Sequence, residues 1–290
     1  MTREQDIAQR MEIIMRIFSE AQTYCEKERV FINLALKLDE TENEFRSVAY
    51  EAASMSIALD ELEKDLSLSR WLEYKNGIGR KHASQVHAGL GWALAKRKIS
   101  PAAILEKIDP LLQLKVIDGY GYYEGIFRHR SSVISKIIPA EIGAPLLPGF
   151  DQGIGRALYY NSKGMIDKIP AKISSFPETR QADLWRGVGM ACIYVGGCDE
   201  KMFNDLFSLA RKYAGQLTVS AALVSSARND AESVTPYVHS ACTYWCRCRF
   251  ENVIDVTART ASILPQNDNA YKEWMLAIAD QLSTAGEARV

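Results

Sequence analysis

The sequence predicts an all-α protein made of helical hairpins that repeat about every 34 residues and form a superhelical solenoid or an α/α ring. Three observations support this fold class. Apolar residues recur at helical spacing along nearly the whole chain, and no segment alternates as a strand does. Glycine and proline are sparse, at 18 and 9 of 290 residues, which leaves long stretches without helix breakers. Four segments with a Gly-x-Gly core also follow one another at nearly constant spacing.

The N-terminal segment is the first predicted helix. Its apolar residues form one stripe, and charged residues occupy the opposite face. The stripe consists of Ile7, Met11, Ile14, Met15, Phe18 and Ala21. Two later helix starts are indicated where a capping side chain precedes a proline, at Ser100-Pro101 and at Asp109-Pro110.

The glycine motif sets the period of the repeat. The first glycines of the four copies are Gly89, Gly119, Gly153 and Gly187. They are separated by 30, 34 and 34 residues, and small residues near Ala53 and Ala221 extend the series to about six units. Glycines at positions i and i+2 lie roughly 200° apart around a helix, so they thin it on opposite sides. We therefore expect neighbouring helices to press closely on both flanks, or a surface kept open for a ligand.

Helical segments between the motif helices complete the predicted hairpins. Their ranges are 102–115, 165–174, 202–214 and 237–249. The longest break in the helical pattern is 138–150, which carries three prolines. We interpret residues 1–290 as one helical repeat domain, with 138–150 as a hinge loop between its halves.

Composition and charge exclude several functional classes. The chain is 47% apolar and 24% charged, as is usual for a folded globular protein. Thirty-five basic and 36 acidic residues give a net charge of −1. The chain therefore has no overall positive charge that would attract the phosphates of a nucleic acid. No apolar run approaches the ~18 residues of a membrane helix, and the mixed charges at the start differ from a secretory signal. We expect a cytoplasmic location.

The six cysteines contain no Cys-x-x-Cys pair. His239, Cys242 and Cys246 fall on one helix face by their spacing, and a metal site is one interpretation of that cluster. The interpretation that we favour is reduced thiols in the core or at an interface, because free cysteine behaves as a small buried apolar residue. No cofactor motif identifies a cofactor or a metal, and both stay unknown.

Polar and aromatic residues gather beside the glycine motif. If the motif helices line a concave side, these residues converge on one groove. Their side chains are of the types that act in general acid–base catalysis and in stabilising developing charge. The candidate catalytic residues are Glu51, His87, Asp118, Asp151, Arg156 and Asp183. The candidate substrate-binding residues are Tyr50, Trp92, Tyr122, Glu124, Gln152, Trp185 and Arg186. An aromatic lining of this kind suits an extended, unsaturated or cationic organic ligand.

Structural roles for the same residues stay open at this point. Asp118 and Asp151 are placed as helix N-caps by one interpretation. Arg156 and Arg186 then pair with neighbouring acidic residues and hold adjacent repeats in register. The aromatic residues are repeat core in this interpretation. The Gly-x-Gly motifs are not dinucleotide fingerprints, because no strand precedes them and the third glycine is missing.

Five blocks of the chain resemble, in order, the UnbL family of enediyne-biosynthesis proteins. The blocks are residues 48–55, 86–95, 111–127, 151–158 and 182–189, and the resemblance extends over about residues 7–264. It implies an accessory role in converting a linear polyene into an enediyne-type polyketide, together with UnbV-like and UnbU-like proteins. It also implies functional roles for the polar residues that match the family. These are Glu51, His87, Asp118, Asp151, Gln152, Arg156, Asp183 and Arg186.

Two hypotheses of different class follow. The first is a protein of specialised-metabolite biosynthesis that binds or modifies a linear polyene or related polyketide in an aromatic groove, with the carboxylates as acid–base or metal-facing groups and Arg156 as an anchor. The second is a non-catalytic scaffold whose concave surface binds a partner protein of the pathway. Nucleic-acid binding and a membrane span are not expected.

Overall fold

A computed structural model describes residues 2–264 and 270–287. This part of the chain contains fourteen α-helices and no strand, which confirms the all-α class. The helices are α1 (Arg3–Lys27), α2 (Phe31–Asp39), α3 (Asn43–Leu62), α4 (Ser69–Asn76), α5 (Ala83–Arg97), α6 (Pro110–Phe127), α7 (Leu147–Asn161), α8 (Ile169–Ser174), α9 (Glu178–Val195), α10 (Glu200–Ala210), α11 (Ala214–Asp230), α12 (Pro236–Trp245), α13 (Phe250–Ser262) and α14 (Ala270–Glu287).

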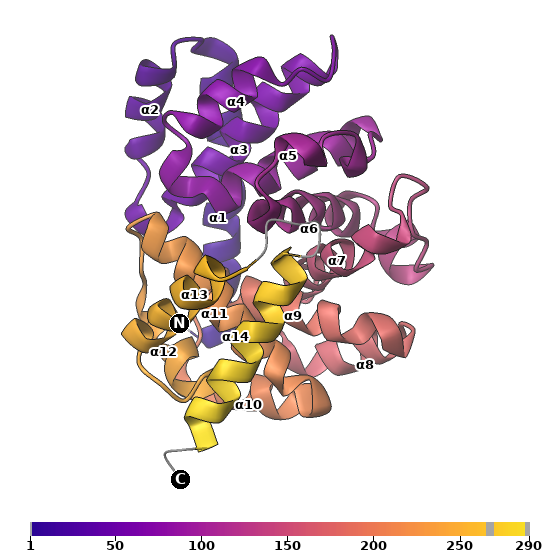
Figure 1. Cartoon of the computed structure of the whole chain (residues 1–290), viewed down its shortest axis with the longest axis vertical. Coiled ribbons are helices and arrows are strands. Elements are labelled where there is room, and N and C mark those ends of the chain that lie inside the picture. Colours follow the sequence, from indigo (N-terminus) through magenta and orange to yellow (C-terminus); the bar gives the residue numbers. More distant parts are fainter. Residues whose placement is uncertain (1, 265–269, 288–290) are drawn as a thin grey trace.

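Six of these helices carry the glycine motif or its small-residue counterpart, and each packs against the next. They are α3, α5, α6, α7, α9 and α11, which we call the motif helices. Figure 1 shows α5, α6, α7 and α9 following one another toward the lower end of the molecule. The buried residues of these helices form one continuous hydrophobic core. The sequence thus places its smallest residues where consecutive helices meet.

The glycines allow backbone-to-backbone contact between motif helices. A Cβ added to Gly89 would lie 2.2 Å from the carbonyl oxygen of Glu51 in α3, and one added to Gly91 would lie 1.9 Å from that of Val116 in α6. No side chain fits at such distances, so each helix is thin on both flanks. The expectation of close neighbours on two sides is confirmed.

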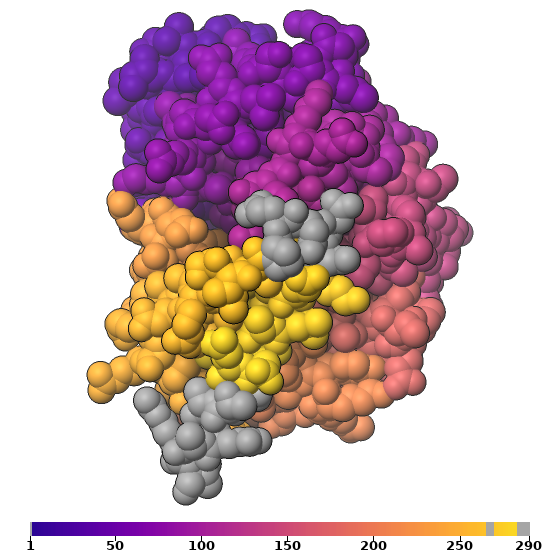
Figure 2. All heavy atoms as spheres, viewed as in Figure 1, coloured from indigo at the N-terminus to yellow at the C-terminus, as the bar shows by residue number. Residues whose placement is uncertain are grey.

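Two terminal helices close over the motif helices. α1 packs chiefly against α3 and also reaches α9, while α14 packs against α6, α11 and α13. In Figure 1, α14 crosses in front of the motif helices. The space-filling view of the same side shows the yellow C-terminal segment lying over the middle of the molecule (Figure 2). The last motif helix also returns to the first, because an Arg228 Nη in α11 donates to the carbonyl oxygen of Glu44 in α3.

Several predicted boundaries need correction. The helix predicted over 102–115 is wrong: two short 3₁₀ turns occupy 101–103 and 105–107, and α6 begins at Pro110. Asp109 caps α6 as predicted, since its carboxylate accepts from the Leu111 N–H. Ser100 does not cap a helix, because its hydroxyl donates to the Glu141 carbonyl oxygen at 2.7 Å.

The predicted break at 138–150 is shorter than expected. α7 begins at Leu147, so Pro148 lies in its first turn, where a missing N–H costs no helical hydrogen bond. The other three predicted second helices correspond to α8, α10 and α12, although α8 begins only at Ile169 and α12 ends at Trp245. Whether the remaining break acts as a hinge stays a prediction.

Candidate functional site

A cavity of about 420 Å³ lies between α1 and the motif helices. We call it the first cavity. Most of its wall is apolar or aromatic. The apolar and aromatic side chains include Ile14, Met15 and Phe18 from α1, Trp92 from α5, Tyr122, Tyr123 and Phe127 from α6, Tyr160 from α7 and Tyr194 from α9. Its volume falls in the range of small-molecule sites in proteins.

The aromatic rings of this wall pack on one another. The ring centroids of Phe18 and Trp92 lie 5.0 Å apart, and Trp92 meets Tyr122 edge to face at the same distance. Such pairs hold each ring in a fixed orientation. Two of the predicted substrate-binding residues, Trp92 and Tyr122, therefore lie in the cavity wall, while the indole Nε1 of Trp92 has no hydrogen-bond partner.

Glu51 is the acidic group of the first cavity that lacks a partner. It follows Ala49 and precedes Ala52 in the buried small-residue run of α3, and only 5% of it is exposed. Its Oε1 makes no hydrogen bond. Burial raises the pKa of Glu51 to about 7, against the opposing effect of Arg156. A carboxyl group with such a pKa can both give and accept a proton near neutral pH.

Arg156 supplies the positive charge next to Glu51. Its Nη1 donates to Asp118 Oδ2 at 2.6 Å, and its guanidinium lies 4.2 Å from the ring centroid of Tyr122. Burial disfavours the charged form, but Asp118 and then Glu51 hold the pKa of Arg156 above its ordinary value. Arg156 is thus a fixed cation in the cavity wall, and Asp118 is its counter-ion.

The N-cap interpretation of Asp118 and Asp151 is wrong. Both residues lie inside helices, in α6 and α7, and both are buried. Asp151 accepts two hydrogen bonds from the Arg180 Nε and a third from Nη2 at 2.5 Å. Burial raises the pKa of Asp151 to about 6, although Arg180 opposes this shift. The Asp151–Arg180 pair joins α7 to α9 and does not line the first cavity.

The pairing predicted for the arginines is present. Arg186 in α9 donates through Nε to Gln152 Oε1 in α7 at 2.6 Å and pairs with Asp183 on its own helix. Arg186 and Asp183 line a separate groove beside α14. These three candidate residues therefore lie together, but away from Glu51 and the first cavity.

The remaining candidates are engaged in packing. The Nδ1 of His87 is hydrogen-bonded to the Ala83 carbonyl oxygen at 2.6 Å, and burial lowers the pKa of His87 to about 4. The hydroxyl of Tyr50 donates to Asp39. Glu124 pairs with the neighbouring Arg128, and Trp185 is buried in the core. None of these four candidates lines the first cavity.

Sequence reasoning missed several polar residues of the first cavity, among them Tyr194 and Arg228. The Tyr194 hydroxyl and the Arg228 Nε are buried and have no hydrogen-bond partner. Burial lowers the pKa of Arg228, against the opposing effects of Tyr194 and Glu44, and its guanidinium donates to the backbone carbonyl oxygens of Glu44, Ser233 and Tyr194. A signal was available, because Tyr160, Tyr194 and Arg228 follow one another at intervals of 34 residues, the period of the motif.

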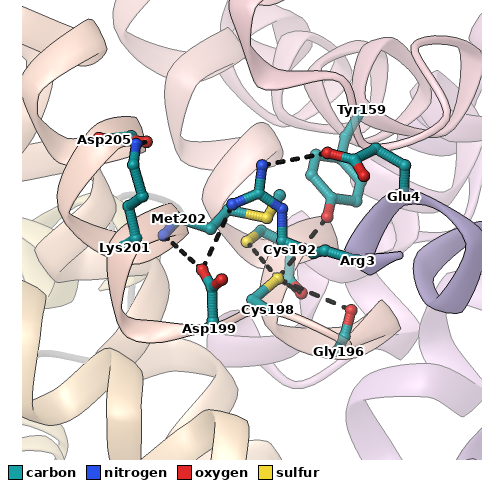
Figure 3. Close-up of polar contacts among 10 residues, drawn as sticks. All are labelled: Arg3, Glu4, Tyr159, Cys192, Gly196, Cys198, Asp199, Lys201, Met202 and Asp205. Carbon is teal, nitrogen blue, oxygen red and sulfur yellow. Dashed lines mark hydrogen bonds and ion pairs between the residues drawn. The ribbon is translucent and has the colours of Figure 1, made fainter. Parts of the chain in front are cut away.

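α1 is held over the cavity by polar contacts at its first turns. Arg10 donates through Nε to the Val195 carbonyl oxygen and through Nη2 to Glu44, both at 2.6 Å, so it ties α1 to α9 and α3. Figure 3 shows Arg3 reaching Asp199 just after α9. Gly197 has φ +75° and lets the chain pass close to Ile7. These contacts fix the helix that closes the first cavity.

Five of the cysteines are buried in or beside the core as free thiols: Cys25, Cys192, Cys198, Cys242 and Cys246. Cys242 and Cys246 are buried in α12 and at its end, and the ring of His239 packs against Phe250. Figure 3 shows Cys192 and Cys198 near the hydroxyl of Tyr159, with the two sulfur atoms 3.3 Å apart. Within residues 2–264 and 270–282, no group of three or more His, Cys, Asp or Glu side chains is arranged to hold a metal ion.

The described part of the chain is an all-helical protein with an aromatic-walled cavity. The chain belongs to a family described as a protein of unknown function (DUF1702), whose family model matches residues 1–282. No curated protein and no solved structure matches the chain. Among the described helices, none combines the length and apolar character that crossing a membrane requires.

Proposed function

We propose that the first cavity binds an elongated, unsaturated small molecule of the linear polyene class and that Glu51 exchanges a proton with it. One observation carries this proposal: a buried carboxyl group with an unpartnered oxygen faces an aromatic-walled cavity of about 420 Å³. Aromatic faces stack on extended π-systems, so the wall favours a conjugated chain over a saturated one. An unpartnered buried polar atom in such a wall is typical of a ligand site.

The residues around Glu51 divide the work. Glu51 removes a proton from one carbon of the chain and returns it to another, which shifts a double bond without any oxidant. Arg156, held by Asp118, stabilises the negative charge that spreads along the conjugated system during this transfer. Trp92 and Tyr122 pack edge to face and together form one wall along which the chain is oriented. The enzyme class is thus a polyene-modifying proton-transfer enzyme.

The pathway is a further part of the proposal. The resemblance of blocks such as 86–95 and 111–127 to UnbL proteins supports a role in enediyne-type polyketide biosynthesis in the cytoplasm, beside UnbV-like and UnbU-like proteins. We also propose that the motif helices and their partners are true 34-residue repeats. The 34-residue spacing of Tyr160, Tyr194 and Arg228 in one cavity wall supports this.

The methyl ester of trans-parinaric acid, an uncharged fluorescent tetraene, tests the proposal directly. We expect it to quench tryptophan emission by energy transfer, and to lose much of this transfer in Trp92→Phe but not in the matched control Trp274→Phe, which lies outside the first cavity. The apolar ligand removes water from Glu51 and favours its neutral form. Affinity should therefore fall as the pH rises through about 7.

Glu51→Gln separates the two parts of this test. The variant cannot ionise at position 51, so its affinity for the ester should not change with pH. Binding without any pH dependence in the wild-type protein would overturn the acid–base role of Glu51. The absence of energy transfer at every pH, together with copurification of a pathway protein, would favour the scaffold hypothesis instead.

A further inference from the structure

A second cavity of about 370 Å³ is lined by other residues of the motif helices. The first turns of α5 and α6 line it, together with the last turns of α11, the helix α13 and Trp274 of α14. It shares no lining residue with the first cavity. Its wall includes Leu112, Ile254 and Trp274, so the space is largely apolar. The site proposed above does not use it.

Lys115 of α6 lines the second cavity and is unusually deeply buried for a lysine. Only 4% of it is exposed, and its Nζ has no hydrogen-bond partner. Buried lysines are rare in proteins unless they are paired. The nearest aromatic ring is that of Tyr271, whose centroid lies 6.0 Å from Nζ. A lysine with a purely structural role usually extends its ammonium group to water or pairs it with a carboxylate.

Other buried polar atoms near Lys115 are also unpartnered. Asp118 stands one helical turn further along α6, and its Oδ1 makes no hydrogen bond although Oδ2 binds Arg156. The Tyr271 hydroxyl and the Gln152 Nε2 likewise have no partner. Unsatisfied buried polar atoms are few in folded proteins, and each costs free energy. Of these residues only Lys115 lines the second cavity, and its unpartnered amine is therefore the one that the polar group of a ligand there would approach.

We propose that Lys115 is a nucleophile that condenses with the carbonyl group of a small apolar aldehyde or ketone held in the second cavity. The neutral amine forms a bond from Nζ to the carbonyl carbon, and the carbonyl oxygen leaves as water with the two protons of the amine. The product is an imine, and no oxidant or reductant takes part.

The charges around Lys115 favour the reactive form of the amine. Burial lowers its pKa to about 8, while Asp118 of the same helix raises it and Arg156 of α7 and Arg186 of α9 lower it. Tyr271 of α14 faces the amine as a neutral phenol, because burial raises its pKa. The cavity wall also contains Asp109 and Asp230, and burial raises the pKa of Asp230. A desolvated lysine of this kind is a recognised source of Schiff-base chemistry.

Reductive trapping of the full-length protein tests the proposal. The protein is incubated with butanal and sodium cyanoborohydride at pH 7.5, and the butylated lysines are located by peptide mass mapping. The matched control is Lys172, whose pKa burial also lowers, but which is hydrogen-bonded to Ser162 and lies outside the cavity. We expect Lys115 to react at least about tenfold faster than Lys172, because more of its amine is neutral.

Two further measurements complete the test. The rate at Lys115 should rise with pH and level off above about 8, the pH at which its amine becomes mostly neutral. Lys115→Met should remove the fast modification, and Lys172→Met should leave it. Butylation spread over the exposed lysines with none at Lys115, or a Lys115 rate that still climbs steeply above pH 9, would overturn the proposal. The readout is independent of polyene binding, so it separates this proposal from the function proposed for the first cavity.

Discussion

The two cavities of this protein share the motif helices and differ in the charge that each leaves unpaired. On α6, Lys115, Asp118 and Tyr122 follow one another along one face, a turn apart. Lys115 belongs to the second cavity and Tyr122 to the first, so Asp118 stands between the two. Glu51, whose Oε1 has no hydrogen-bond partner, lines the first cavity, and Lys115, whose Nζ has none, lines the second.

Burial moves both groups toward neutrality, in opposite directions on the pH scale. It raises the pKa of Glu51 to about 7 and lowers that of Lys115 to about 8. Between them, Asp118 and Arg156 form a buried ion pair that holds α6 against α7. The difference teaches that the buried pairs Asp118–Arg156 and Asp151–Arg180 join neighbouring motif helices, whereas Glu51 and Lys115 each line a cavity without an ion-pair partner among the described residues.

Breaking the central pair should have the largest effect. Asp118→Asn leaves the buried Arg156 without a counter-ion, and we expect a loss of about 4 kcal/mol in the free energy of unfolding, measured with urea. Asp118 also raises the pKa of both Glu51 and Lys115. The pH midpoint of Lys115 butylation and the pH midpoint of ester binding should therefore both move lower.

Asp151→Asn is the matched control for that prediction. It breaks a similar buried pair, with Arg180, outside both cavities. We expect a comparable loss of stability without a shift of either midpoint. If Asp151→Asn moved both midpoints as far as Asp118→Asn does, the central role given to Asp118 would be wrong.

A methyl group at a motif glycine should have the next largest effect. Gly91→Ala places a Cβ 1.9 Å from the Val116 carbonyl oxygen, so α5 and α6 must separate. Overpacking of this kind costs about 3 kcal/mol, and the separation should weaken binding in both cavities together. Thermal unfolding and the two ligand assays measure these effects.

The control glycine is Gly215, in the first turn of α11. A Cβ added there meets no atom within 4 Å. Alanine is the better helix former, so Gly215→Ala should gain about 0.5–1 kcal/mol. Equal destabilisation by Gly91→Ala and Gly215→Ala would show that the motif glycines do not act through close helix contact.

The sequence alone predicts the motif helices because their packing depends on residues that are visible in the chain. Positions 89 and 91 require glycine, because a Cβ at either one would lie within about 2 Å of the carbonyl oxygen of a neighbouring helix. The failed helix at 102–115 has a different cause. Its apolar residues also suit short 3₁₀ turns, and helical spacing does not separate the two.

Site residues were predictable only as far as the motif reaches. Four of the candidate residues stand beside motif positions and line the first cavity: Glu51, Trp92, Tyr122 and Arg156. The ion pair of Asp151 with a residue 29 positions away depends on how α9 packs, which the sequence does not display. Lysine is usually exposed, so nothing in the sequence marks Lys115 as buried.

The smallest expected effects are those of Glu51 and Lys115 on the way the free energy of unfolding changes with pH. The raised pKa of Glu51 means that the folded protein binds this proton more tightly than the unfolded chain does. Glu51 therefore lowers stability as the pH rises from about 4.5 to 7, by up to about 3 kcal/mol. The lowered pKa of Lys115 acts in the opposite sense, and stability recovers by a similar amount as the pH rises from about 8 to 10.5.

Two variants isolate these contributions in urea unfolding at several pH values. Relative to the wild-type protein, Glu51→Gln should gain stability at pH 7.5 and little at pH 4, since the wild-type carboxyl group is neutral at the lower pH. Lys115→Met should also gain stability at pH 7.5, and the gain should shrink toward pH 10.5, where the wild-type amine is neutral. A Lys115→Met gain that is constant from pH 7 to 10.5 would show that apolar packing, and not the relief of a buried charge, distinguishes the second cavity from the first.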